Sequence, residues 1–206
     1  MQLFCSYLND IWVLESPPNN AFNTLEVVEI LLEGSVDDVA SALTEQGVKN
    51  SSRVAQKLVN LLNACHMAFG TNFYMDTSTI VTFDVELAKA LHCVIGAGII
   101  KTPGSYRTIA VQAAQSTVAY ALPAQISVRM DTLFEWVRSR VDEANSKTDA
   151  VDRADFMFRV GAVFFSEFLL IHPFANGNGR TARLLLSFFL LNITTVPLSL
   201  SVSSPS

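Results

Sequence analysis

The amino-acid sequence predicts a mainly α-helical fold with one short β-hairpin, and three observations support that prediction. Apolar residues recur at three- and four-residue steps through most of the 206 residues, which is the spacing of one helix face. Two apolar segments, 162–171 and 184–193, are each long enough for about three helical turns and too short to span a membrane. β-branched residues flank a turn-like stretch within 108–122, which predicts a short β-hairpin, with an irregular loop as the alternative.

The composition excludes several classes of protein. Half of the residues are hydrophobic and 16% are charged, so the chain is too apolar to be disordered. The net charge of −5 and the absence of a basic run argue against a nucleic-acid partner. No membrane partner is expected, and residues 1–16 lack the pattern of a signal peptide, so cytoplasmic is the default location. Cys5, Cys65 and Cys93 are scattered among apolar residues, which indicates buried thiols.

The first helices are expected from local patterns in the N-terminal third of the chain. Helical spacing covers 22–34, and Gly34 is suited to the position just after a helix. A short helix follows over 35–46. Asn50 or Ser51 then caps a longer helix whose apolar face belongs to the core.

The remaining helices follow in the same way. Thr82 is expected to cap a helix, and Pro123 to begin another that extends to about residue 141. The polar stretch 143–149 indicates a loop. A helix over 152–171, apolar nearly all round in its second half, is expected at the centre of the fold, and the last helix ends near residue 192.

The stretch 172–183 carries the chemistry and reads His-Pro-Phe-Ala-Asn-Gly-Asn-Gly-Arg-Thr-Ala-Arg. It joins the two apolar helices. Gly177 and Gly179 allow the backbone to turn and leave amide groups bare at the start of the second helix. Such a helix start binds anions. Arg180 and Arg183 are three residues apart, share one face of the first turn, and suit a chain of phosphates.

His172 ends the helix that precedes this cradle. An imidazole with a pKa of about 6.5 is able to accept a proton at pH 7. A base beside a phosphate cradle indicates transfer of a phosphorus group to a hydroxyl. Each residue type alone is common in turns and helix ends, and it is their joint occurrence in this order that points to a site.

The stretch 172–183 resembles the signature of Fic-domain proteins, His-x-Phe-x-(Asp/Glu)-Gly-Asn-Gly-Arg-x-x-Arg. A second match precedes it, because Leu91 and His92 followed by 103–108, Pro-Gly-Ser-Tyr-Arg-Thr, resemble the start of the Fic core. His92 by itself is interpreted as structural. The resemblance implies a Fic-type helical bundle with a short β-hairpin flap over the active site.

The resemblance also implies a reaction, protein adenylyltransfer (AMPylation). AMP would pass from ATP, with Mg²⁺ as cofactor, to a hydroxyl side chain of a target protein, which the flap at about 108–122 would hold by strand addition. His172 would be the catalytic base. The nest at Gly177, Asn178 and Gly179 would hold the α- and β-phosphates. Arg180 would bind near the β-phosphate and Arg183 the γ-phosphate, while Phe174 would anchor the loop.

One position departs from the family pattern. Asn176 stands where the family usually has an acid, and its neutral amide oxygen is a weak ligand for Mg²⁺. The departure keeps two alternatives open: a nucleotide-binding Fic domain with impaired catalysis, and transfer of another phosphate-containing group.

A second resemblance concerns control of the site. Many Fic proteins carry an inhibitory helix with the pattern (Ser/Thr)-x-x-x-Glu-(Gly/Asn), whose glutamate pairs with the second arginine of the signature. Glu33 and Gly34 match that pattern, whereas Glu29 replaces the Ser or Thr. The resemblance makes Glu33 the inhibitory residue, paired with Arg183. The alternative is that Glu29 and Glu33 are simply exposed. A third activity, removal of AMP from a protein with Glu33 positioning water, also stays open.

These resemblances divide the chain at about residue 75. Residues 1–75 are expected to form an N-terminal helical region that includes the inhibitory helix at 22–34. Residues 76–206 are expected to form a Fic core that ends earlier than such cores usually do. Neither the target protein nor the oligomeric state follows from the sequence, and a homodimer is left open.

Overall fold

The protein is mainly α-helical, as predicted from the sequence. The structure is a computed structural model that describes residues 7, 24–70, 82–112, 119–194 and 197–198. Its helices, in chain order, are α2 (Thr24–Glu33), α3 (Val36–Glu45), α4 (Ser51–Phe69), α5 (Val85–Gly96), the 3₁₀ turn η1 (Pro123–Gln125), α6 (Ile126–Asn145), α7 (Ala150–Ile171) and α8 (Asn178–Thr194).

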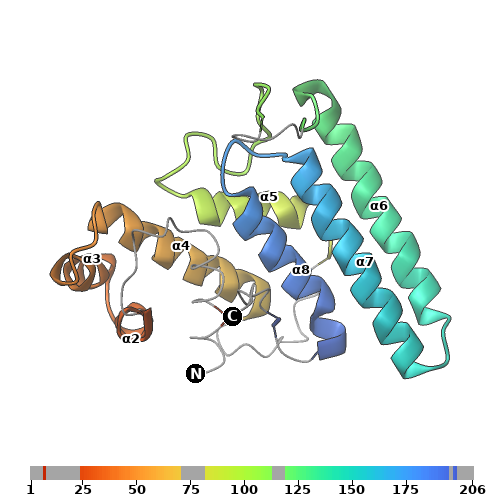
Figure 1. Ribbon diagram of the computed structural model, residues 1–206, viewed down its shortest axis with the longest axis horizontal. Helices are drawn as coiled ribbons and strands as arrows, with labels where there is room; N and C mark the ends of the chain where they lie inside the picture. The colour runs from red at the N-terminus through yellow and green to blue at the C-terminus, as the bar shows by residue number, and fades with distance from the viewer. Residues whose placement is uncertain (1–6, 8–23, 71–81, 113–118, 195–196, 199–206) are drawn as a thin grey trace, which may run out of the picture.

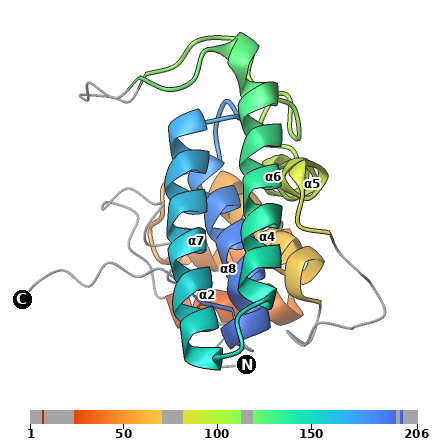
Figure 2. The ribbon, with the colours of Figure 1, turned by 90° about the vertical axis from the view of Figure 1, so that its right-hand side faces the viewer.

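The three long C-terminal helices form the body of the fold (Figure 1). α6 and α7 lie side by side, and α8 packs on α7, while α5 and α4 also contact α8. α2 and α3 lie at the far end of α4, away from α6 and α7 (Figure 1). The α5–α6 connection lies at the end of the bundle where α7 turns into α8 (Figure 2). The fold therefore brings two connections, far apart in sequence, to one end of the helices.

Polar side chains fix several helix starts. Ser35 caps α3 in a capping box, because its hydroxyl accepts from Asp38 N and the Asp38 carboxylate accepts from Ser35 N. Asp84, not the predicted Thr82, caps α5 by accepting from Leu87 N at 2.9 Å. The cap falls two residues later than expected because the Asp84 carboxylate is the side-chain oxygen that reaches the first turn. Asp149 caps α7, so that helix starts before residue 152.

Aromatic side chains join the helices in the core. The ring of Phe83 lies 5.1 Å from the rings of Phe134 (α6) and Phe164 (α7), and 5.3 Å from that of Phe189 (α8), measured between centroids. Large rings that are buried together contribute both apolar area and favourable edge contacts. This cluster holds α6, α7 and α8 in register and so positions the turn between α7 and α8.

Several sequence expectations differ from the structure or lie outside it. Cys65 is buried, but Cys93 is exposed because it lies on the solvent side of α5, so the prediction of a buried thiol is wrong there. The described residues contain no β-strand; a single antiparallel bridge joins Gln112 and Ala119. Residues 113–118 lie outside the described part, so the hairpin flap stays a prediction.

Three further expectations stay predictions because they fall wholly or partly on residues that the structure does not describe. These are the domain boundary near residue 75, the start of the predicted helix 22–34 and the end of the chain from residue 199. No helix in the described ranges has the length and apolar character that a bilayer crossing requires.

Candidate active site

The predicted joint between two helices is present in the structure. α7 ends at Ile171, and His172 follows in the left-handed conformation (φ 50°, ψ 60°), with its N–H donating to Phe168 O. α8 begins at Asn178, so residues 172–177 form the turn. A left-handed residue at a helix end stops the helix and turns the chain sharply. This turn lies at the end of the bundle that also holds the α5–α6 connection (Figure 2).

The position of His172 and the neutral state of its ring both suit a general base. Its ring is half-buried, and the Nδ1 atom is buried with no hydrogen bond of ordinary geometry among the described residues. Burial lowers the pKa of His172 below 6.5, the Leu169 backbone partly opposes this, and the positive charge of Arg107 lowers the pKa further. The imidazole is therefore neutral at pH 7 and able to accept a proton.

The glycines of the signature have different roles. Gly177 has a φ of +78°, so the turn requires a residue without a Cβ there. Gly179 instead lies in the first turn of α8, so the expectation that it turns the backbone is wrong. Because it has no side chain, Gly179 adds nothing that could cover the N-terminal amides of α8. The N–H groups of residues 178–180 have no partner within the helix because they belong to its first turn.

Asn178 uses its side chain to hold the turn. Its Oδ1 accepts from Phe174 N at 2.9 Å, and its Nδ2 donates to Phe174 O at 2.8 Å. The side chain is buried and fully used in these two hydrogen bonds, so it is not available to a ligand. Phe174 itself is fully buried, in agreement with the role of an anchor.

The arginines lie on the first turns of α8. Arg180 is buried and Arg183 is half-buried. Arg180 lies close enough to His92 that its charge lowers the pKa of that ring, after the larger effect of burial. The structure therefore brings together the base, the first-turn amides and the two arginines that were predicted from the sequence. Anions are stabilised at such a helix start by both the amides and the helix dipole.

Two basic residues of α4, which sequence reasoning missed, extend this positive region. Burial lowers the pKa of Lys57, and the charges of Arg180 and Arg53 lower it further. Within the described ranges, no carboxylate forms an ion pair with Arg53 or Lys57. Arg53 and Lys57 are four residues apart and share a helix face. Only the packing of α4 against α8 shows that this face meets the signature.

His92 supports the turn from α5. Its ring stacks on that of Phe174, with centroids 3.8 Å apart and planes 3° apart. Gly104 N donates to His92 Nδ1 at 2.8 Å, so the ring proton is on Nε2, which donates to Asn176 O at 2.9 Å. The interpretation of His92 as structural fits this geometry. It links the 103–108 segment to the signature.

Arg107 is a second brace, and it is only 4% exposed. Its main-chain N–H donates to Pro173 O at 2.9 Å. Its side chain donates to the main-chain carbonyls of His172 (2.7 Å), Ile109 (2.8 Å), Ile171 (3.3 Å) and Ala121. A guanidinium has five N–H donors in a fixed plane, which suits this task. Arg107 therefore ties both ends of the predicted flap to the catalytic turn. The sequence offered only the Tyr-Arg of the second family match as a signal.

Asn176 does not form a metal site by itself. Its side chain is exposed, and its Oδ1 already accepts from Gly177 N at 2.7 Å. The described part of the chain holds no group of three or more His, Cys, Asp or Glu side chains able to bind a metal ion. Mg²⁺ prefers carboxylates together with substrate phosphates. The residues present at the turn therefore do not fit a metal held by the protein.

Glu33 lies apart from the signature. It is the exposed last residue of α2, and no ion pair joins it to Arg183, both of which are described. α2 packs mainly on α3 at the far end of α4 (Figure 1). The structure thus does not bring Glu33 together with the other predicted site residues.

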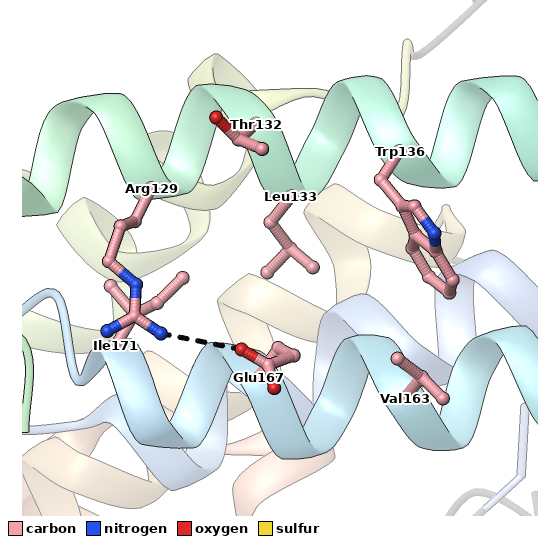
Figure 3. A pocket seen from close by; sticks show the side chains of 7 residues that line it. All are labelled: Arg129, Thr132, Leu133, Trp136, Val163, Glu167 and Ile171. Carbon is pink, nitrogen blue, oxygen red and sulfur yellow. Dashed lines mark hydrogen bonds and ion pairs between the residues drawn. The ribbon is translucent and has the colours of Figure 1, made fainter.

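A hollow of about 360 Å³ lies elsewhere, between α6 and α7 (Figure 3). Trp136, Leu133 and Val163 line it, and Arg129 faces Glu167 across it with 3.5 Å between the charged atoms. None of residues 172–183 lines this hollow. The chemistry of the signature therefore does not take place there.

Comparison with known protein families finds one match that covers more than half of the chain. The sequence profile of the Fic/DOC family matches residues 82–190. That range contains α5 to α7, most of α8, the turn at 172–177 and both bracing residues.

Curated relatives match shorter segments. The chain is 30% identical over 101 residues to protein adenylyltransferase fic-1 of Caenorhabditis briggsae (49% of this chain, 18% of the relative). It is 30% identical over 82 residues to fic-1 of Caenorhabditis elegans (40% and 14%). A 64-residue segment is 39% identical to the ribonucleoside-diphosphate reductase small chain of Ostreid herpesvirus 1 (isolate France), covering 29% of this chain and 11% of that protein. The chain thus spans less than a fifth of the length of each relative.

Solved structures share the fold. A Fic family protein from Desulfovibrio desulfuricans G20 superposes with a TM-score of 0.62 at 19% identity, covering 93% of this chain and 48% of that one. A Fic-domain signalling protein from Bacteroides thetaiotaomicron gives 0.59 at 20% identity (92% and 62%). A fragment of Fic-1 from C. elegans gives 0.63 at 19% identity (97% and 51%). At these identities the similarity establishes the helical fold.

Proposed function

The chain belongs to the Fic/DOC family, and on that premise we propose that it is a protein adenylyltransferase, which transfers AMP from ATP to a hydroxyl side chain of a target protein. One observation carries the proposal. A neutral, half-buried histidine lies one short turn before a helix start that presents bare amides and two arginines. A base beside a polyphosphate cradle is the arrangement that phosphoryl-group chemistry needs.

The proposed reaction uses His172 as the general base. Nε2 of His172 takes the proton of the acceptor hydroxyl, and the hydroxyl oxygen attacks the α-phosphorus of ATP. The bond from the α-phosphorus to the bridging oxygen breaks, and pyrophosphate leaves. The lowered pKa of His172 keeps the ring neutral before the reaction, and a proton on Nδ1, toward the Leu169 backbone, leaves Nε2 free to accept another. The amides of Asn178 and Gly179 hold the α- and β-phosphates in this proposal; the Gly177 N–H, expected to join them, donates to Asn176 Oδ1 in this structure.

Positive charge in the proposed site matches the charge of the leaving group. Arg180 binds near the β-phosphate and Arg183 near the γ-phosphate. Lys57 lies close to Arg180, as its lowered pKa indicates, and it adds a further cation. Guanidinium groups bind phosphates through paired N–H donors, and cations stabilise charge as it develops on pyrophosphate. Mg²⁺ enters the proposal only as a companion of ATP held by phosphate oxygens, and no step here depends on it.

The protein substrate is proposed to lie along 108–122. Arg107 fixes the carbonyls of Ile109 and Ala121, so both ends of this segment are held beside His172. An extended acceptor segment would add main-chain hydrogen bonds there. This mode of binding selects an accessible strand and says little about the sequence of the target.

Restraint by Glu33 is a separate part of the proposal, and it rests on the sequence pattern. Because Glu33 is exposed and unpaired with Arg183 in this structure, restraint requires α2 to approach α8. Glu29 is also exposed, lies one turn earlier in α2, and is a matched control.

The test measures incorporation of label into protein from α-³²P-ATP and, separately, γ-³²P-ATP. It compares the unmodified chain with His172→Ala, Glu33→Ala and Glu29→Ala. Label from the α-position that is lost in His172→Ala supports adenylyltransfer with His172 as base. An increase in Glu33→Ala but not in Glu29→Ala supports restraint, and equal activity of the two variants overturns it. Label from the γ-position alone redirects the assignment to phosphate transfer.

A second candidate function is favoured by Asn176. Its neutral, hydrogen-bonded amide gives Mg²⁺·ATP no carboxylate, which fits a Fic domain that binds nucleotide with impaired catalysis. Asn176→Asp distinguishes the two. Label that increases several-fold in Asn176→Asp supports impairment in the natural chain, whereas unchanged label favours a competent site. Release of AMP from a modified protein, which depends on Glu33, is measured in the same samples.

A further inference from the structure

The ring of Tyr120 lies flat on the ring of His172. The centroids are 4.0 Å apart and the planes differ by 16°. Tyr120 comes from the α5–α6 connection, so this contact is made across the bundle and not along the chain. The main chain next to Tyr120 is held on its C-terminal side, since Ala121 donates from N to Leu170 O at 3.3 Å and accepts at O from Arg107. The residue before it, Ala119, forms the bridge with Gln112.

The main chain of His172 is held by two hydrogen bonds, whereas its ring interacts with the Leu169 backbone alone among the polar groups of the described residues. The N–H donates to Phe168 O at 3.0 Å, and the carbonyl accepts from Arg107 Nε at 2.7 Å. The ring atom Nδ1 is buried without a hydrogen bond of ordinary geometry among the described residues. Histidines that work as bases or ligands usually fix their orientation through the second ring nitrogen. In this chain the contact with the Leu169 backbone has poor geometry, so packing against the face of the ring becomes important for its orientation.

We propose that Tyr120 is a positioning residue: its stacked ring holds the imidazole of His172 in the plane that directs Nε2 toward the acceptor hydroxyl. The inference rests on the proposed function, because it assigns an orientation to the base of that reaction. Burying Nδ1 leaves Nε2 as the nitrogen that is able to meet a substrate. A parallel ring at 4.0 Å blocks rotation of the imidazole plane, since an edge-on imidazole would collide with it.

The stack serves the reaction in both protonation states. Before transfer, the two neutral rings pack as an aromatic pair. After His172 takes the proton, the imidazolium lies over the electron-rich face of the tyrosine ring, which favours the cation. Neither contribution uses the phenolic hydroxyl. Phenylalanine should therefore replace tyrosine, whereas an aliphatic side chain of similar size should not.

The test compares Tyr120→Phe and Tyr120→Leu in the intact 206-residue chain by two measurements. The first is the ¹H–¹³C NMR spectrum of the histidine rings. The sequence has three histidines, and His172→Ala identifies the signals of His172. A stacked ring shifts the His172 ring protons upfield. The second is kcat and KM for ATP in the labelling reaction. His92, which stacks on Phe174, reports whether the turn itself stays folded.

The expected result has three parts. Tyr120→Leu moves the His172 ring signals downfield, leaves the His92 signals in place, and lowers kcat by about five- to tenfold with KM for ATP within about twofold. Tyr120→Phe keeps the natural spectrum and kcat. Unshifted His172 signals in Tyr120→Leu overturn the inference, and so does equal loss of kcat in both variants.

The two proposals fail in different ways. Absence of any histidine-dependent label in the natural chain removes the proposed function. The His172 ring signals still decide whether Tyr120 orients the ring, because that measurement needs no activity.

Discussion

The turn at 172–177 and the C-terminal end of α2 both match family patterns, but the fold treats them differently. The turn is braced from outside by His92 and Arg107, which reach it from α5 and the segment after it. The end of α2 has local contacts, such as Gly34 N to Ile30 O at 2.7 Å, and Glu33 is exposed. A pattern that the rest of the chain supports with long-range hydrogen bonds is specified in three dimensions. A pattern whose hydrogen bonds are all made within its own helix specifies only the end of that helix.

The largest effect on the braced turn is expected from the substitution Arg107→Leu. The substitution leaves several carbonyls around the turn without a donor, and buried unpaired carbonyls are costly. We expect the free energy of unfolding to fall by about 3 kcal/mol and labelling to fall by more than about tenfold. Urea denaturation and the labelling reaction measure the two effects. Arg138→Leu on the exposed face of α6 is the control, with a change within about 0.5 kcal/mol.

His92→Phe removes the second brace more selectively. Phenylalanine keeps the stacked contact with Phe174 but loses the hydrogen bonds to Gly104 and Asn176. We expect the free energy of unfolding to fall by about 2 kcal/mol, since one donor and one acceptor lose their partner. Denaturation in urea measures it. A loss as small as that of Arg138→Leu would show that the turn does not depend on His92.

Acid should destabilise the folded chain through its histidines, two of which lie at the braced turn, and urea denaturation at several pH values measures this. Burial lowers the pKa of His66, His92 and His172 below 6.5. Between about pH 6.5 and the lower folded pKa values, the unfolded chain therefore binds more protons than the folded one. The free energy of unfolding should decrease as the pH falls through this window, and less so in His92→Phe.

The catalytic activity should also decrease as the pH falls. Protonation of His172 removes the base, so kcat/KM should fall on the acid side with a midpoint below 6.5, the ordinary value for the imidazole. The pH profile of labelling measures it. A midpoint above 6.5 would contradict the burial of His172.

Lys57→Met tests whether a cation from α4 contributes to ATP binding at the turn. The substitution keeps an apolar stem but removes a cation next to Arg180. We expect ATP to bind about threefold more weakly, as for one half-exposed charge, and the salt dependence of binding to decrease. Isothermal titration measures the affinity. Lys49→Met, at an exposed position before α4, should leave it unchanged.

The smallest effect is expected at the end of α2. Glu33→Ala removes an exposed carboxylate from the last turn of a helix, where the helix dipole disfavours negative charge. The free energy of unfolding should change by no more than about 0.5 kcal/mol. A loss near that of His92→Phe would mean that Glu33 has a partner in solution that the structure lacks.

The helices could be predicted from the sequence because helix periodicity is a local property. The apolar faces of α4, α6 and α7 were predicted correctly. Helix boundaries differ by a few residues where the capping residue was predicted wrongly, as at Asp84. The exposure of Cys93 was misread because hydrophobic neighbours in sequence lie on other sides of a helix.

The sequence by itself determined the chemistry of the signature: a histidine at a helix end, a glycine that permits positive φ at 177, and arginines on one face of the following helix. These features depend on residues within one turn of each other. Only the tertiary structure decided what orients them: the carbonyls that Arg107 joins, the ring that covers His172, and the cation beside Arg180. Those contacts depend on which helix faces meet, and local spacing does not encode how separate helices pack.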